Sequence, residues 1–264
     1  MNLSAARGAM DFSTGVAYHG KDLDPGPRRL SRPGSTGPRP GAAGLGSAMA
    51  KAWMPGAERI EGGAVRTATG GGAPRAVWTV TGSDPNTWSA REEAHRLVHK
   101  GESVHLVWNP LTGAVAQTLA ATRRSGLALG STSRHGLCLE HGDEGRVCLV
   151  VAVVATEEEP FTGGPLVGLA PIVDWLESWG VSRNWPAGPP GVRDERSPSP
   201  EETVRVWSRG GHFGHGQVPG SLSTAPGRVA PERVLAAGLH GTVPAARPPQ
   251  LSRKHPGHQP SVTT

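Results

Sequence analysis

Cysteine is almost absent from this sequence, and that scarcity excludes whole classes of site. Cys138 and Cys148 are the only two in 264 residues, and no CxxC pair occurs. Zinc ribbons and dithiol redox sites need closely spaced thiolates, so both are excluded. Because the sequence also shows no export signal, we expect two reduced thiols rather than a disulfide.

Long apolar segments are missing as well. No run of about 18 apolar residues occurs, which is the length that a membrane-spanning helix needs. The first twenty residues lack the charged and apolar regions of a signal peptide. These absences predict a cytoplasmic protein with no membrane partner, which would leave a cell only by lysis or a non-classical route.

Aromatic residues make up only 5% of the chain, and their positions locate the core. All eight Trp lie between Trp53 and Trp207, whereas 38 Gly and 25 Pro make up nearly a quarter of the sequence. The low-complexity segment 26–48 cannot bury enough apolar surface to offset its ordering entropy. We therefore expect a disordered tail over 1–52, a domain over 53–240 with a Pro-rich internal link at 186–200, and a disordered basic tail over 241–264.

Positive charge is concentrated outside the expected domain. Residues 1–50 hold six Lys and Arg against three acidic residues, and residues 227–264 hold five against one. Residues 52–226 hold fifteen against eighteen. The basic residues of the tails are scattered among Pro and Gly with no aromatic residues between them, so a nucleic-acid partner is not favoured.

Apolar patterning predicts alternating strands and helices in the central part of the chain. The β-branched run at 75–81 and the valine-rich run at 146–156 are typical of buried strands, the second one central in its sheet. Residues 103–119 predict a hairpin around the turn at 109–113. Apolar spacing predicts helices at 89–101 and 168–180, and a short one from Pro231. This order of elements predicts an α/β domain.

The same elements resemble a known family. The segments are VWTVTGSD, VHLVWNPLTGAVAQ, VCLVVAVV, GLAPIVDWLESWGV and GHFGHGQVPGSLSTAPG. In this order they resemble the zinc N-acetylmuramoyl-L-alanine amidases, a family that includes the peptidoglycan recognition proteins. The resemblance covers about residues 53–240. It implies a central mixed β-sheet flanked by helices and a peptidoglycan or muropeptide partner.

The resemblance also implies where a metal site would lie. In the family, two His and an Asp or Cys hold zinc with a water, and a glutamate helps to move the proton. Thr79 and Ala225 stand at two of the ligand positions here, Ala152 stands at the glutamate position, and His215 is the sole remaining ligand. One imidazole cannot hold zinc, so no cofactor is expected unless other residues rebuild the site.

Three further residues are candidates for binding a ligand. His105 lies where the family often has a histidine that touches substrate, and Asn109 follows it in the same hairpin. His212 precedes His215 by three residues and would reach the same ion if that turn were helical. The alternative interpretation is structural: both turn histidines are then surface residues, and His105 is a strand residue bonded to a neighbour.

Three functions remain open at this point. The degenerate site favours a non-catalytic protein that binds peptidoglycan or muropeptide fragments in the former active-site groove. The second is an active zinc amidase that hydrolyses the muramoyl-L-alanine bond with relocated ligands. The third is a scaffold or interaction protein on the same fold.

Overall fold

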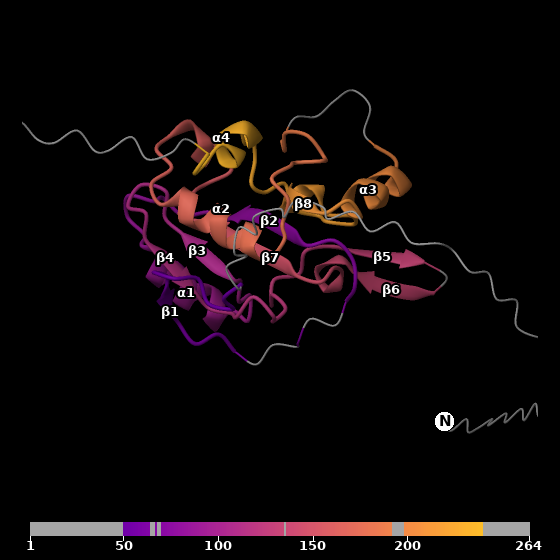
Figure 1. Cartoon of the computed structure of the whole chain (residues 1–264), viewed down its shortest axis with the longest axis horizontal. Coiled ribbons are helices and arrows are strands. Elements are labelled where there is room, and N and C mark those ends of the chain that lie inside the picture. The colour runs from indigo at the N-terminus through magenta and orange to yellow at the C-terminus, as the bar shows by residue number, and fades with distance from the viewer. Residues whose placement is uncertain (1–49, 64–66, 68–69, 135, 192–197, 240–264) are drawn as a thin grey trace, which may run out of the picture. The chain divides into compact units, whose positions relative to one another are not determined.

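The computed structural model describes residues 50–63, 67, 70–134, 136–191 and 198–239 (Figure 1). The predicted tails lie outside the described residues, apart from 50–52, and so do residues 192–197 of the predicted link. Among the described helices, none is both long and apolar enough to cross a membrane.

Six strands form one mixed sheet in the order β1-β4-β3-β7-β2-β8. The β3–β4 pair is antiparallel, as predicted for the hairpin, and the other neighbouring pairs are parallel. The fold class, a central mixed sheet flanked by helices, is confirmed. The strands are β1 (Glu58–Arg59), β2 (Arg75–Val80), β3 (Leu106–Trp108), β4 (Val115–Gln117), β7 (Cys148–Val153) and β8 (Gly211–Gly214).

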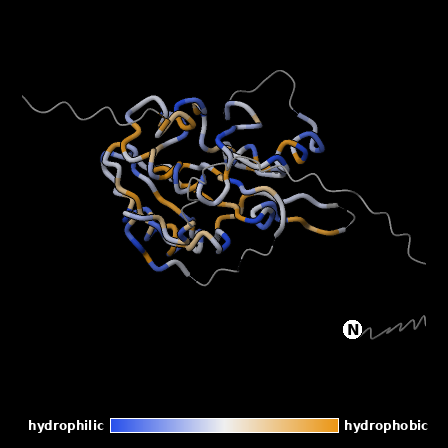
Figure 2. The backbone as a smooth tube through the Cα atoms, viewed as in Figure 1, coloured by the Kyte–Doolittle hydropathy of each residue, from blue (hydrophilic) through white to orange (hydrophobic). Residues whose placement is uncertain are grey.

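The valine-rich strand β7 lies between β3 and β2, and all six of its residues are buried. A strand covered on both faces needs apolar side chains on both, which explains why its sequence does not alternate. The prediction of a central strand is confirmed. Figure 2 shows hydrophobic residues gathered along these inner strands.

Helices cover both faces of the sheet (Figure 1). The helices are α1 (Ala90–His99), α2 (Leu169–Ser178), α3 (Pro200–Trp207) and α4 (Pro231–Leu235). Both predicted long helices and the short one are confirmed, and Ser89 and Glu92 form the expected capping box on α1.

Alternation along β2 sorts its side chains between the two layers. Trp78 packs in one apolar cluster with Ile172 and Leu176 of α2. Val77 packs in the other with Ala94 of α1. Thr79 follows Val77 by two residues and therefore points to the same face as Val77. This alternation decides which side chains of the strand can lie in the same site.

Several elements escaped sequence analysis. The stretch 120–145 contains the hairpin β5 (Ser131–Arg134) and β6 (Leu137–Glu140). Leu137 and Leu139 of β6 are exposed, and Figure 2 shows this strand in hydrophobic colours. Helix α3 starts at the last residue of the predicted link, with Ser199 as its N-cap. The glycine-rich segment expected to be a turn forms β8 at the sheet edge.

Candidate functional site

The four positions that the family resemblance singles out lie together at the carboxyl ends of the inner parallel strands. Thr79 of β2 is paired in register with Ala152 of β7. The Thr79 hydroxyl lies 3.4 Å from Nδ1 of His215, the first residue of the 3-10 turn η3 (His215–Gln217). The Gly216 amide donates to the Ala225 carbonyl at 2.7 Å. Residues far apart in the sequence therefore form one buried group.

The imidazole of His215 has partners on both ring nitrogens. Its Nε2 lies 3.2 Å from the Ala128 carbonyl and 3.1 Å from the Leu129 carbonyl. Carbonyl oxygens only accept, so Nε2 carries the proton and Nδ1 presents its lone pair to the Thr79 hydroxyl. Burial lowers the pKa of His215, which favours this neutral form.

These residues do not fit a zinc ion. Neither Ala152 nor Ala225 has a side-chain donor, and the Thr79 hydroxyl is not among the side chains that protein zinc sites use. No group of three His, Cys, Asp or Glu side chains suited to a metal occurs in the described part of the chain. No hydrolytic step through a metal follows from this arrangement.

His212 lies on the opposite face of the sheet from His215. Trp78, which contacts His212, and Thr79, which contacts His215, are consecutive residues of β2, so their side chains point to opposite faces. The Trp78 indole donates to His212 Nδ1 at 3.0 Å, and the ring stacks between those of Trp78 and Trp185. Its Nε2 has no hydrogen-bond partner within the described residues. Burial lowers the pKa of His212 to about 4. The structure therefore does not bring the two histidines together.

His105, the residue before β3, is fully buried and bonds to β7 and to the chain at Arg123. The Val150 amide of β7 donates to its Nδ1 at 3.0 Å. Nε2 must then carry the proton, which it donates to the Arg123 carbonyl at 2.9 Å. Burial lowers the pKa of His105 to about 4. These hydrogen bonds match the structural interpretation of His105, although the residue lies just before β3 and not within a strand.

Asn109 uses its whole side chain to fix a turn. Its amide nitrogen donates to the carbonyls of Pro85 and Trp88, at 2.8 and 3.0 Å. Its carbonyl oxygen accepts from the amides of Leu111 and Thr112. The residue is buried and connects the end of β3 to the loop before α1, away from His215.

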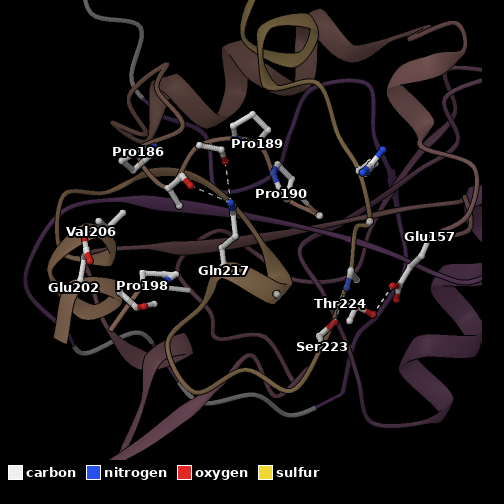
Figure 3. A pocket seen from close by; sticks show the side chains of 18 of the residues that line it. Glu157, Pro186, Pro189, Pro190, Pro198, Glu202, Val206, Gln217, Ser223 and Thr224 are labelled. Atoms are coloured by element: carbon white, nitrogen blue, oxygen red, sulfur yellow. Dashed lines mark hydrogen bonds between the residues drawn. The ribbon is translucent and has the colours of Figure 1, made fainter. Parts of the chain in front are cut away.

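A groove of about 1390 Å³ opens beside the buried group (Figure 3). Its walls are the Pro-rich loop 186–191, the start and one side of α3, and the chain around Gly216 and Ala225. Among the described lining residues, the charged side chains are those of Glu157, Glu202 and Arg228. The sequence predicted a groove at the former active site but not these walls, because the loop 186–191 was interpreted as part of a link.

Gln217 holds the Pro-rich wall in place. Its oxygen accepts from the Trp185 indole at 2.7 Å and from the Gly214 amide at 2.9 Å. Its nitrogen donates to the Gly188 carbonyl at 2.9 Å (Figure 3). One side chain thus joins η3, β8 and the loop, which fixes the groove next to His215.

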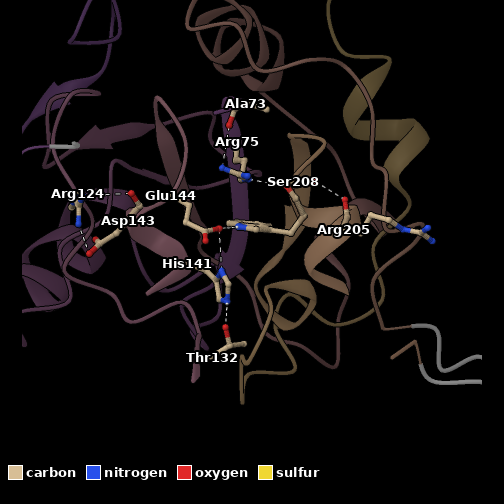
Figure 4. A network of polar contacts seen from close by, with 10 residues as sticks. Ala73, Arg75, Arg124, Thr132, His141, Asp143, Glu144, Arg205 and Ser208 are labelled. Atoms are coloured by element: carbon tan, nitrogen blue, oxygen red, sulfur yellow. Dashed lines mark hydrogen bonds and ion pairs between the residues drawn. The ribbon is translucent and has the colours of Figure 1, made fainter. Parts of the chain in front are cut away.

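A second polar cluster lies outside the groove (Figure 4). His141 Nδ1 lies 3.1 Å from a carboxylate oxygen of Glu144, and its Nε2 lies 3.0 Å from the Thr132 hydroxyl. The Trp207 indole donates to the same carboxylate oxygen at 2.8 Å, and the Arg75 guanidinium lies 4.6 Å above the Trp207 ring. The cluster ties β5 to the end of α3 and to the sheet.

No family model and no curated protein matches the sequence. Solved structures similar to the chain include an amidase and a peptidoglycan recognition protein. One similar structure, a selenomethionine derivative of AmpD, is 14% identical with a TM-score of 0.41, covering 72% of this chain and 98% of its own.

The second is the endolysin LysCS, an N-acetylmuramoyl-L-alanine amidase from Clostridium intestinale. It is 13% identical with a TM-score of 0.40, covering 71% of this chain and 97% of its own. The third is the Drosophila peptidoglycan recognition protein SD, 17% identical with a TM-score of 0.36, covering 63% of this chain and 81% of its own.

Proposed function

We propose that the protein binds peptidoglycan or muropeptide fragments in the groove beside His215 without hydrolysing them. The observation that carries this proposal is the meeting of Thr79, Ala152, His215 and Ala225 in one buried group that contains a single metal-type donor. The groove touches Gly216 and Ala225, so a bound fragment would lie against that group.

The absence of hydrolysis follows from the chemistry of the donors. Amide hydrolysis by a metal requires a polarised carbonyl and an ionised water, which three or four ligands hold in place. The side chain of Ala152 can move no proton, and both nitrogens of His215 are engaged. Binding needs none of these groups.

The proposal is tested by co-sedimentation with insoluble peptidoglycan at moderate salt, with release of soluble fragments measured in parallel. We expect retention of the protein and no release, with or without added zinc. Ala187→Trp places a large side chain in the groove wall and should weaken binding at least about fivefold, a loss of roughly 1 kcal/mol. Ser182→Trp, at an exposed position outside the groove lining, should leave binding unchanged.

Each contrary result identifies a different alternative. Retention no better than that of an unrelated acidic domain would overturn the proposal and favour a scaffold function. Zinc-dependent release of fragments would favour the active amidase with relocated ligands.

A further inference from the structure

The groove has no aromatic side chain among its described lining residues. The two tryptophans nearest to its walls in sequence, Trp185 and Trp207, are buried and donate their indole protons to other side chains. A sugar ring would therefore find no exposed aromatic face on which to stack. Rigid apolar walls are instead supplied by the prolines of the 186–191 loop and by Pro198, which suit an extended peptide.

Carboxylates dominate the charge of the groove. Glu157 and Glu202 face it from opposite ends (Figure 3), and Arg228 is the single cation among the described lining residues. Neither carboxylate forms an ion pair within the described part of the chain.

Glu157 is the better placed of the two carboxylates. It is only partly exposed, and one of its oxygens accepts a hydrogen bond from the Thr224 hydroxyl, next to Ala225. This bond fixes the carboxylate before any ligand arrives, which reduces the entropy cost of a contact. Its second oxygen has no partner among the described residues and is available to a donor.

We infer that the groove selects peptides that carry a free primary amine, held as an ammonium group by Glu157. This inference rests on the proposed function and specifies its ligand. The diamino acid of a stem peptide has such an amine, which is protonated near neutral pH. Cross-linking converts the amine into a neutral amide, so the groove would prefer stem peptides that are not cross-linked.

The test compares two probes by titration calorimetry with the full chain: a disaccharide tetrapeptide with a free side-chain amine, and the same compound acetylated on that amine. For the wild-type protein at low salt, we expect acetylation of the amine to raise Kd about fivefold, because a partly exposed charged hydrogen bond contributes roughly 1 kcal/mol. Added salt should weaken binding of the free amine and leave the acetylated probe unaffected.

Matched variants separate charge from shape. Glu157→Gln keeps an acceptor for Thr224 and should bind both probes alike. Glu159→Gln, an exposed acid on the same loop but outside the lining, should keep the wild-type preference.

The outcomes are distinguishable. Equal, salt-insensitive binding of both probes by the wild-type protein would overturn the inference and leave the proposed function standing. Binding of neither probe would overturn the proposed function, and the inference with it.

Discussion

Two buried histidines, His105 and His212, are held neutral in this protein, and both act as parts of the framework. Each accepts a hydrogen bond at Nδ1, from the Val150 amide and the Trp78 indole respectively. In each case burial lowers the pKa to about 4. A charged imidazole at either place would lose its acceptor and face an apolar surrounding.

These shifts predict that stability falls in mild acid. An unfolded histidine has a pKa of about 6.5, so between about pH 6.5 and 4 the unfolded chain binds more protons than the folded one. The free energy of unfolding should decrease by about 1 kcal/mol for each of the two histidines between pH 7 and pH 5.5. Urea unfolding at the two pH values measures this, and an unchanged midpoint and slope would contradict it.

Replacing His105 tests its role directly. His105→Ala leaves the Val150 amide and the Arg123 carbonyl without these partners in a buried place, so we expect a loss of about 2–4 kcal/mol in the free energy of unfolding. His95→Ala, at an exposed position of α1, is the control and should change stability by less than about 0.5 kcal/mol. Equal losses of stability in both variants would contradict a structural role for the His105 side chain.

At the scale of elements, the groove depends on one glutamine that connects three segments. Gln217 joins β8, η3 and the Pro-rich loop through two accepted hydrogen bonds and one donated bond. The loop 186–191 forms no helix or strand. Its position therefore depends on contacts of this kind rather than on a ladder of backbone hydrogen bonds.

Gln217→Ala should loosen the Pro-rich wall. We expect a loss of about 1–3 kcal/mol, because the Trp185 indole and the Gly214 amide lose their acceptor, together with faster hydrogen exchange at the amides of 187, 188 and 191. Gln217→Glu keeps both acceptor bonds and loses only the donor to Gly188, so its effect should be smaller. Unchanged exchange in both variants would show that other contacts hold the wall.

At the scale of the whole molecule, the described residues hold no set of zinc ligands, and this affects how the melting temperature responds to zinc. A metal that binds only the folded state stabilises it by an amount that grows with the logarithm of the metal concentration above Kd, and so raises the melting temperature. We expect zinc or EDTA to shift the wild-type melting temperature by no more than about 1 °C, as measured by scanning calorimetry. A rise of several degrees with zinc that EDTA reverses would contradict this.

A designed variant with added metal ligands should show the zinc response that the wild-type protein lacks. Thr79→His with Ala225→Asp adds two donors around His215, which supplies the three ligands that a zinc site needs. Zinc should raise the melting temperature of this variant by several degrees. A variant that folds but does not respond to zinc would contradict the convergence of these positions.

The sequence by itself determined the local elements. The capping box at Ser89 and Glu92, the valine run of β7 and the apolar stripe of α2 each carry their signal within one element, so each was predicted. The expected meeting of Thr79 and His215 came from the family resemblance, and the register of β2 with β7 and the η3 turn place them together.

Only the tertiary structure decided what those residues face. The three-residue spacing of His212 and His215 was equally compatible with one shared ion and with opposite faces, and an edge strand in place of a turn separates them. The composition of the groove walls escaped prediction for the same reason. Its walls come from a Pro-rich loop and from α3, and what holds the loop is the side chain of Gln217, a contact between distant residues that no local pattern encodes.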